Sequence, residues 1–179
     1  MRNKINTGLI HIYCGDGKGK TTAGMGLCVR AAAAGLKVVI CQFMKDNSSS
    51  ERSILGRVDN IILIDGPEKV KFSFQMSEDE KRDMRVFYEK LLKTAEDTVM
   101  REHSQVLFLD EVIYCINAGL LPEDRLIAFL NNKPEDLEVI LTGQNPEPAL
   151  IELADYVSEI RKVKHPYDAG VEARTGIER

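Results

Sequence analysis

Residues 15–22 read GDGKGKTT and follow directly on an apolar run. Glycines let backbone N–H groups approach a phosphate closely, and a helix that begins behind such a loop adds the positive end of its dipole. Lysine supplies a compact positive charge for phosphate oxygens, and a threonine hydroxyl can bind a magnesium ion. This stretch therefore predicts a loop that binds the triphosphate of ATP or GTP, formed by Gly15, Asp16, Gly17, Lys18, Gly19, Lys20, Thr21 and Thr22.

Two neighbouring acids, Asp110 and Glu111, end the apolar stretch VLFLDE. Doubly wound α/β folds bind their ligands at the carboxyl ends of the strands, where carboxylates reach the metal ion of a nucleotide. The alternative is that both acids only cap the following helix. After a phosphate loop, we expect at least one of them to bind Mg²⁺, directly or through water.

The elements that position these residues are continuous apolar runs alternating with longer helical segments. Strands are predicted at 9–14, 37–43, 61–65, 105–110 and 137–142, and helices at 19–34, 77–101, 122–131 and 148–154. Ser77 and Glu80 are spaced as a capping box. Segment 45–53 is predicted as a polar loop, and a strand-like piece with an irregular tail follows from 159.

Strands that lack polar alternation are buried on both faces, which favours a parallel sheet with helices on each side. The fold class is therefore α/β: a doubly wound, mainly parallel sheet like that of the phosphate-loop (RecA-like) NTPases, in a single domain over 1–179.

Composition narrows the classes of partner. The chain has 44% apolar and 29% charged residues and a formal net charge of −4, which gives no general attraction to nucleic acid or anionic membrane. No apolar run approaches the roughly 18 residues that span a bilayer, and the start of the chain lacks a cleavage site, so we expect a cytoplasmic protein with small-molecule substrates. The four cysteines lie far apart, which suits buried, reduced thiols.

The whole set of motifs resembles the ATP:corrinoid adenosyltransferases of the phosphate-loop type. The resemblance rests on GDGKGKTT, on VVICQFMK, on KFSF, on FLDEVIYCINAGLLP, on VILTGQNPEPALIELADYVSEI and on the ending RKVKHPYDAGVEARTGIER. The loop alone is generic. The form G-x-G-K-G-K-T-T, with DE followed by a tyrosine three residues on and this ending, is highly specific.

The resemblance implies an enzyme that transfers the 5′-deoxyadenosyl group of ATP to Co(I) of a corrinoid and releases triphosphate, in adenosylcobalamin biosynthesis or salvage. It also explains why Cys14 stands where generic phosphate loops begin with glycine: the family loop begins at Gly15, and Cys14 ends the strand. Lys18 and Lys20 are then the catalytic residues, because their charge stabilises the departing triphosphate. Mg²⁺, with Mn²⁺ as a substitute, is the implied cofactor.

Further site residues come from the same resemblance. Thr21 and Glu111 match the metal-binding pair, beside Asp110, and Arg161 matches an arginine near the nucleotide. Phe72 and Phe74 match an aromatic pair that packs on the corrinoid and displaces the lower axial ligand of Co(II). The implied partners are a second copy of the chain, as a homodimer, and a reduced flavoprotein as electron donor.

Other interpretations of these residues remain open. Arg161 could be a solvated charge at a strand end, and the two phenylalanines, which alternation in an extended segment would put on one side, could be a small hydrophobic cluster under a loop. Lys45 could border the pocket or lie in a solvated loop. We expect His11 and His103 to be structural. His165 and Asp168 lie in a matched segment without an assigned role, although a lone histidine before a proline is more often structural than catalytic.

Two functions from other classes also fit the loop. A phosphate-loop kinase or NTPase would act on the γ-phosphate, and a non-catalytic carrier would bind a corrinoid or nucleotide without turnover.

Overall fold

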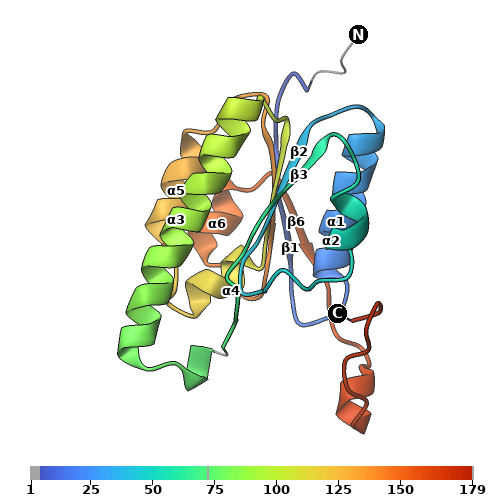
Figure 1. Ribbon diagram of the computed structural model, residues 1–179, viewed down its shortest axis with the longest axis vertical. Helices are drawn as coiled ribbons and strands as arrows, with labels where there is room; N and C mark the ends of the chain where they lie inside the picture. Colours follow the sequence, from blue (N-terminus) through green and yellow to red (C-terminus); the bar gives the residue numbers. More distant parts are fainter. Residues whose placement is uncertain (1–4, 72, 179) are drawn as a thin grey trace.

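The computed structural model describes residues 5–71 and 73–178, in which six parallel strands form one sheet (Figure 1). Their spatial order is β3-β2-β4-β5-β1-β6. The strands are β1 (Ile10–Cys14), β2 (Val38–Gln42), β3 (Ile61–Ile64), β4 (Val106–Asp110), β5 (Glu138–Thr142) and β6 (Tyr156–Glu159). All five predicted strands are present, and the all-parallel pairing confirms the predicted sheet type.

Helices cover both faces of the sheet, as expected of a doubly wound fold. Helices α1 (Lys20–Ala33) and α2 (Arg52–Leu55) lie on one face in Figure 1, while α3 (Glu78–Glu102), α5 (Glu123–Asn131) and α6 (Pro148–Leu153) lie on the other. Residues of α4 (Val112–Asn117) pack in the core on the side of α3. Two short 3₁₀ turns, η1 (Ser73–Gln75) and η2 (Pro166–Ala169), complete the described elements.

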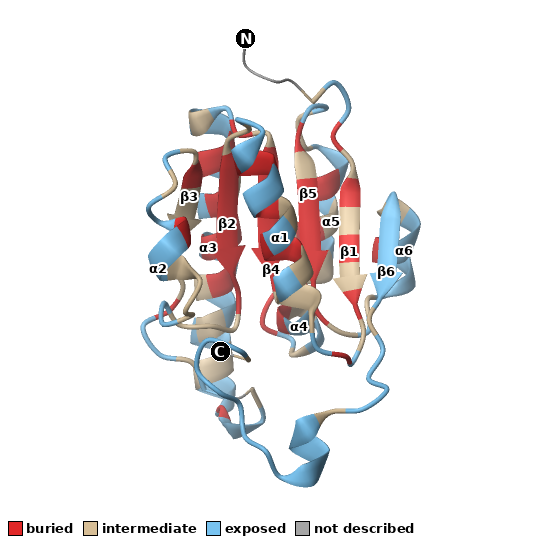
Figure 2. Ribbon diagram, turned by 90° about the vertical axis from the view of Figure 1, so that its right-hand side faces the viewer, coloured by how far each residue is buried: buried red, intermediate tan, exposed pale blue. Residues whose placement is uncertain are grey.

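Burial falls from the centre of the sheet to its β6 edge. Every residue of β2 and β4 is buried, whereas every residue of β6 is exposed (Figure 2). The central strands therefore match their continuous apolar sequences, since both of their faces are covered. All four cysteines are buried and free, as predicted, and burial raises the pKa of Cys28 to about 12.

Helix α3 begins at the predicted capping box. The Ser77 hydroxyl accepts a hydrogen bond from the Glu80 backbone N–H at 3.2 Å, and the Glu80 carboxylate accepts one from the Ser77 N–H at 2.9 Å. The helix ends at His103, whose φ of 51° is left-handed. Among the described helices, none has the length and apolar character needed to cross a membrane.

Several boundaries differ from the prediction. Helix α2 begins within the predicted polar loop 45–53, and α4 was not predicted at all. The last strand lies at 156–159, before rather than after residue 159, because an exposed edge strand carries no apolar run to mark it. Residues 73–75 form a 3₁₀ turn, so the expectation of an extended segment at KFSF was wrong.

Candidate functional site

The predicted phosphate loop lies between β1 and α1 at the carboxyl edge of the sheet. Cys14 is the last residue of β1 and Lys20 the first of α1, as the family form of the loop requires. Gly19 caps the helix with a φ of 128°, a conformation that side chains oppose. The loop lines a pocket of about 320 Å³ together with Glu111 and the segment after β6.

Gly15 and Gly17 must be glycines because the backbone at Ile160 packs directly against them. The Gly17 N–H donates to the Ile160 carbonyl at 2.8 Å. A Cβ added at Gly15 would lie 2.4 Å from the Ile160 oxygen, and one added at Gly17 would lie 2.8 Å from it. The chain leaving β6 thus crosses directly over the loop. Sequence reasoning assigned these glycines to the approach of a phosphate, but close packing against residue 160 already excludes larger residues.

The two loop lysines have different surroundings. The Lys20 ammonium donates to the Gly17 carbonyl at 2.9 Å and is partly buried, whereas Lys18 is exposed. Both line the pocket, as do Asp16, Thr21 and Thr22. All of the predicted loop residues except Gly15 therefore line one cavity, with two positive charges at its wall.

Asp110 is the buried centre of the site, with none of its side chain exposed. Its Oδ1 accepts hydrogen bonds from the hydroxyls of Thr21 at 2.9 Å and Thr142 at 2.7 Å. Its Oδ2 accepts from the Gln42 amide at 3.2 Å and the Lys45 ammonium at 2.6 Å. A carboxylate offers about four lone-pair sites, so Asp110 is saturated by these donors.

Glu111 is in the opposite situation. Its backbone is left-handed, with a φ of 59°, and its N–H donates to the Thr142 hydroxyl at 2.8 Å. Its side chain lines the pocket, and within the described residues no donor is hydrogen-bonded to its carboxylate. Burial, and then the charge of Asp110, raise the pKa of Glu111. Glu111 is thus the carboxylate with oxygens still available to a ligand.

Three of the residues around Asp110 were not predicted as members of the site. Gln42 and Thr142 end the apolar runs of β2 and β5, and Lys45 follows β2. The available signal was a polar residue at the carboxyl end of a run, because parallel strands bring those ends to one edge. Lys45 was considered from the sequence only as a residue that could border the pocket. In the structure its ammonium contacts the buried carboxylate of Asp110.

The side chains of two further predicted residues, Arg161 and Phe74, do not line this pocket. The Arg161 side chain is 78% exposed and pairs with Glu159 at 2.7 Å, and it is not among the residues that line the pocket. Phe74 lies in η1 with 78% of its surface exposed. Phe72 lies outside the described residues.

The segment after β6 forms the second wall of the pocket. In Figure 2 it runs beneath the carboxyl ends of the strands, and His165, Tyr167, Val171 and Glu178 line the cavity. The His165 Nδ1 accepts a hydrogen bond from the Tyr167 N–H at 3.2 Å, so this histidine, which had no assigned role, caps η2. Asp168 pairs with Lys162 at 3.0 Å.

The other two histidines also have structural surroundings, because His103 ends α3 and His11 stacks on Tyr156 and bonds to Glu138.

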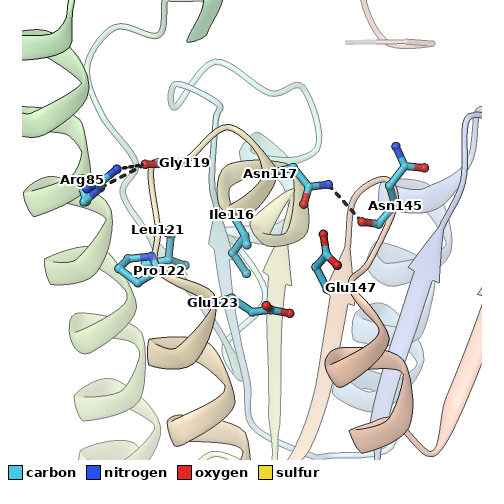
Figure 3. Close-up of a pocket in the computed structure, with 9 residues that line it drawn as sticks. All are labelled: Arg85, Ile116, Asn117, Gly119, Leu121, Pro122, Glu123, Asn145 and Glu147. Atoms are coloured by element: carbon cyan, nitrogen blue, oxygen red, sulfur yellow. Dashed lines mark hydrogen bonds between the residues drawn. The ribbon is translucent and has the colours of Figure 1, made fainter.

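A larger hollow of about 720 Å³ lies between α3, the α4–α5 turn and the β5–α6 loop (Figure 3). Arg85 reaches the Gly119 carbonyl at 2.7 Å on one side, and Asn117 donates to the Asn145 carbonyl at 3.2 Å on the other. Below Asn117 in Figure 3 lie the carboxylates of Glu123 and Glu147. The Glu123 Oε1 is buried without a partner in the described part of the chain, and burial raises its pKa.

Comparison with known proteins identifies relatives over nearly the whole chain. A corrinoid adenosyltransferase of Escherichia coli K12 is 34% identical over 96% of this chain and 85% of its own length. A corrinoid adenosyltransferase of a Sinorhizobium species is 31% identical over 96% of this chain and 80% of its own. An uncharacterised Nostoc protein, all2391, is 29% identical over 99% of this chain but only 50% of its own length.

Solved structures support the fold alone. The KaiC-like protein PH0186 of Pyrococcus horikoshii superposes with a TM-score of 0.55 at 14% identity, over 92% of this chain and 84% of that one. The predicted phosphate-loop, RecA-like fold class is thereby confirmed. The model of the family described as ATP:corrinoid adenosyltransferase BtuR/CobO/CobP matches residues 6–179, so the chain belongs to this family.

Proposed function

We propose that this protein transfers the 5′-deoxyadenosyl group of ATP to Co(I) of a corrinoid and releases triphosphate. The observation that carries the proposal is the family match over residues 6–179, which includes the loop GDGKGKTT, and residues 16–22 of that loop line the pocket. In this reaction a bond forms between cobalt and the 5′ carbon, while the bond from that carbon to the α-phosphate oxygen breaks. The electron pair of the broken bond leaves with the triphosphate.

The protein's task is to stabilise that leaving group. Negative charge grows on the departing α-phosphate oxygen, and positive groups aimed at it lower the barrier. Lys20 and Lys18 serve this purpose, and their position on the pocket wall supports it. Because Co(I) is itself the nucleophile and carries no proton to remove, the reaction requires no general base. The residues bind and orient ATP against the corrinoid.

Oxygen ligands for Mg²⁺ are available in the pocket. Magnesium prefers carboxylate and hydroxyl oxygens and is usually held by one or two protein groups together with phosphates. The Thr21 hydroxyl and the free carboxylate of Glu111 fit that requirement, because both line the cavity. Asp110 acts through its neighbours, since its lone pairs are already used. The bound metal supplies positive charge for the triphosphate.

Several further properties follow from the family resemblance. Phe72 and Phe74 contact the corrinoid and displace its lower ligand, and Arg161 contacts the nucleotide once ATP is bound. Residues 1–179 form a single domain. The protein works in the cytoplasm as a homodimer, in de novo synthesis or salvage, and receives electrons from a reduced flavoprotein. The exposed position of Phe74 on η1 is compatible with ligand contact.

The decisive experiment is anaerobic incubation with ATP, Mg²⁺ and a chemically reduced corrinoid. The expected result is loss of the Co(I) spectrum with stoichiometric release of intact triphosphate. Tight binding of both ligands with no turnover would instead indicate a carrier.

A second candidate function, hydrolysis or transfer of the γ-phosphate, is favoured by Glu111 alone. An acid that follows the buried Asp110 and faces the pocket could activate a water molecule or hydroxyl group. This activity produces ADP or GDP, whereas adenosyl transfer leaves the three phosphates joined. Analysis of the phosphate product therefore separates the two functions.

A further inference from the structure

Lys45 occupies an unusual position for a lysine. It follows β2 after a turn in which Met44 has a φ of 53°, and its ammonium lies 2.6 Å from Asp110 Oδ2 and 3.2 Å from the Thr21 hydroxyl oxygen. Only 27% of its side chain is exposed, against none for Asp110. The contact is therefore a partly buried ion pair at the base of the site.

Charge balance makes this pair necessary whenever no metal is bound. An ionised carboxylate with no exposed surface requires a compensating positive charge. The other three donors to Asp110, from Thr21, Thr142 and Gln42, are neutral groups. The loop lysine Lys20 donates instead to the Gly17 carbonyl. Within residues 5–71 and 73–178, Lys45 is the one cation hydrogen-bonded to Asp110.

The same ammonium competes with the proposed metal. It donates to the hydroxyl oxygen of Thr21, the atom that would bind Mg²⁺ beside Glu111. A divalent ion and an ammonium that share one oxygen repel each other strongly where little water screens them. The position next to Thr21 and Asp110 is thus held by a positive charge that belongs to the protein itself.

We propose that Lys45 is the resident counter-cation of the site when no metal is bound, and that it keeps free metal out until Mg²⁺ arrives with the triphosphate and replaces it on the Thr21 hydroxyl oxygen next to Asp110. The inference rests on the metal site assigned under the proposed function. It adds that metal binding is coupled to nucleotide binding, because phosphate charge is needed to offset the displaced ammonium. Lys45 is therefore a positioning residue with a defined effect on metal affinity.

The test uses nucleotide-free protein and Mn²⁺ alone, detected by electron paramagnetic resonance. Lys45→Met should bind Mn²⁺ at least about tenfold more tightly than wild type, because it removes a unit charge close to the ion. Lys37→Met is the matched control. Lys37 lies just before β2, pairs with Glu102 at 3.2 Å and is 32% exposed, so its removal should leave Mn²⁺ affinity unchanged.

Thermal unfolding gives an independent measurement. At about pH 8, without metal, Lys45→Met should melt about 6 °C or more below wild type, since it leaves the Asp110 charge uncompensated, and Mn²⁺ should restore much of the loss. The double variant Lys45→Met/Asp110→Asn should be more stable than Lys45→Met and should lose the gain in Mn²⁺ affinity.

Equal Mn²⁺ affinity in Lys45→Met and Lys37→Met would overturn the proposal, and so would a double variant no more stable than the single one. If Lys45→Met does not fold, a folded double variant supports the role and an unfolded one contradicts it. None of these readouts uses ATP or a corrinoid. Failure here is therefore distinct from failure of the proposed reaction, which the triphosphate product tests.

Discussion

The two hollows of this protein place acidic residues in contrasting surroundings. Beneath the phosphate-loop pocket, of about 320 Å³, lies Asp110, whose carboxylate accepts hydrogen bonds from four donors. The larger hollow, of about 720 Å³, contains Glu123, which has a buried carboxylate oxygen that no described group hydrogen-bonds. The smaller pocket also has two lysines and the start of a long helix on its wall.

This difference shows that size alone is a poor guide to a nucleotide site. A triphosphate needs converging positive groups and backbone donors, which the loop supplies. In the larger hollow the guanidinium of Arg85 already bonds to the Gly119 carbonyl, and two carboxylates face the space between the elements. Its charge opposes the binding of phosphate.

The largest expected effect comes from removing a loop lysine. Lys20→Ala should lower adenosylation by about a hundredfold or more, the loss typical of one electrostatic contact to a transition state, with little change in melting temperature. Arg85→Ala in the larger hollow is the control and should stay close to wild-type activity. Equal losses of activity in the two variants, or normal turnover by soluble Lys20→Ala, would contradict the assignment of the smaller pocket as the nucleotide site.

Substitution of the acids at the end of β4 tests which carboxylate binds metal. Glu111→Gln should raise the Mg²⁺ concentration needed for activity by about tenfold or more, because a neutral amide is a weaker ligand. Asp110→Asn should chiefly lower stability, since its new N–H₂ group faces donors such as Gln42 and Lys45. Superimposable magnesium titrations for wild type and Glu111→Gln would exclude Glu111 as a ligand.

A third substitution tests the proposed contact of Phe74 with the corrinoid. Phe74→Ala should lower activity by at least about tenfold when the substrate is supplied as Co(II) with a biological reductant, because the lower ligand is no longer displaced. With Co(I) supplied by a strong chemical reductant, much more activity should remain. Phe72→Ala should behave alike. Equal losses in the two assays would leave these phenylalanines as packing residues.

The smallest expected effect is on stability, and it tests whether the Glu123 carboxylate, unlike that of Asp110, lacks compensating partners. Glu123→Gln should stabilise the protein at neutral pH by on the order of 0.5 kcal/mol, because it removes a poorly solvated charge while leaving an amide to satisfy.

The pH dependence of this effect has a definite sign. Burial raises the pKa of Glu123 above its unfolded value, so the folded protein binds the proton more tightly. The Glu123 charge therefore destabilises the wild-type protein above the pKa of the folded state. This destabilisation disappears as the pH falls towards the pKa of the unfolded state. Urea unfolding of wild type and variant across this range should show the difference shrinking on acidification. A constant difference would mean that the Glu123 charge costs nothing.

Much of the fold and part of the site could be predicted from sequence because their signals are local. The loop is one contiguous stretch, and the apolar strands and the capping box of α3 depend on residues close together in the chain. Strand β6 was misplaced because an exposed edge leaves no apolar run. The partners of Asp110 come from separate segments, so only folding reveals that Gln42, Thr142 and Lys45 meet.

The strand order has a consequence for the time at which the nucleotide site can form. Strand β1 is encoded first, yet among the described residues its sheet partners are β5 and β6, which come late in the sequence. Strand β2 can pair with β3 and β4 much earlier during synthesis. The phosphate loop is therefore expected to gain its shape last, once Ile160 has passed over Gly15 and Gly17. A nascent chain would carry a nearly complete core before it could hold ATP.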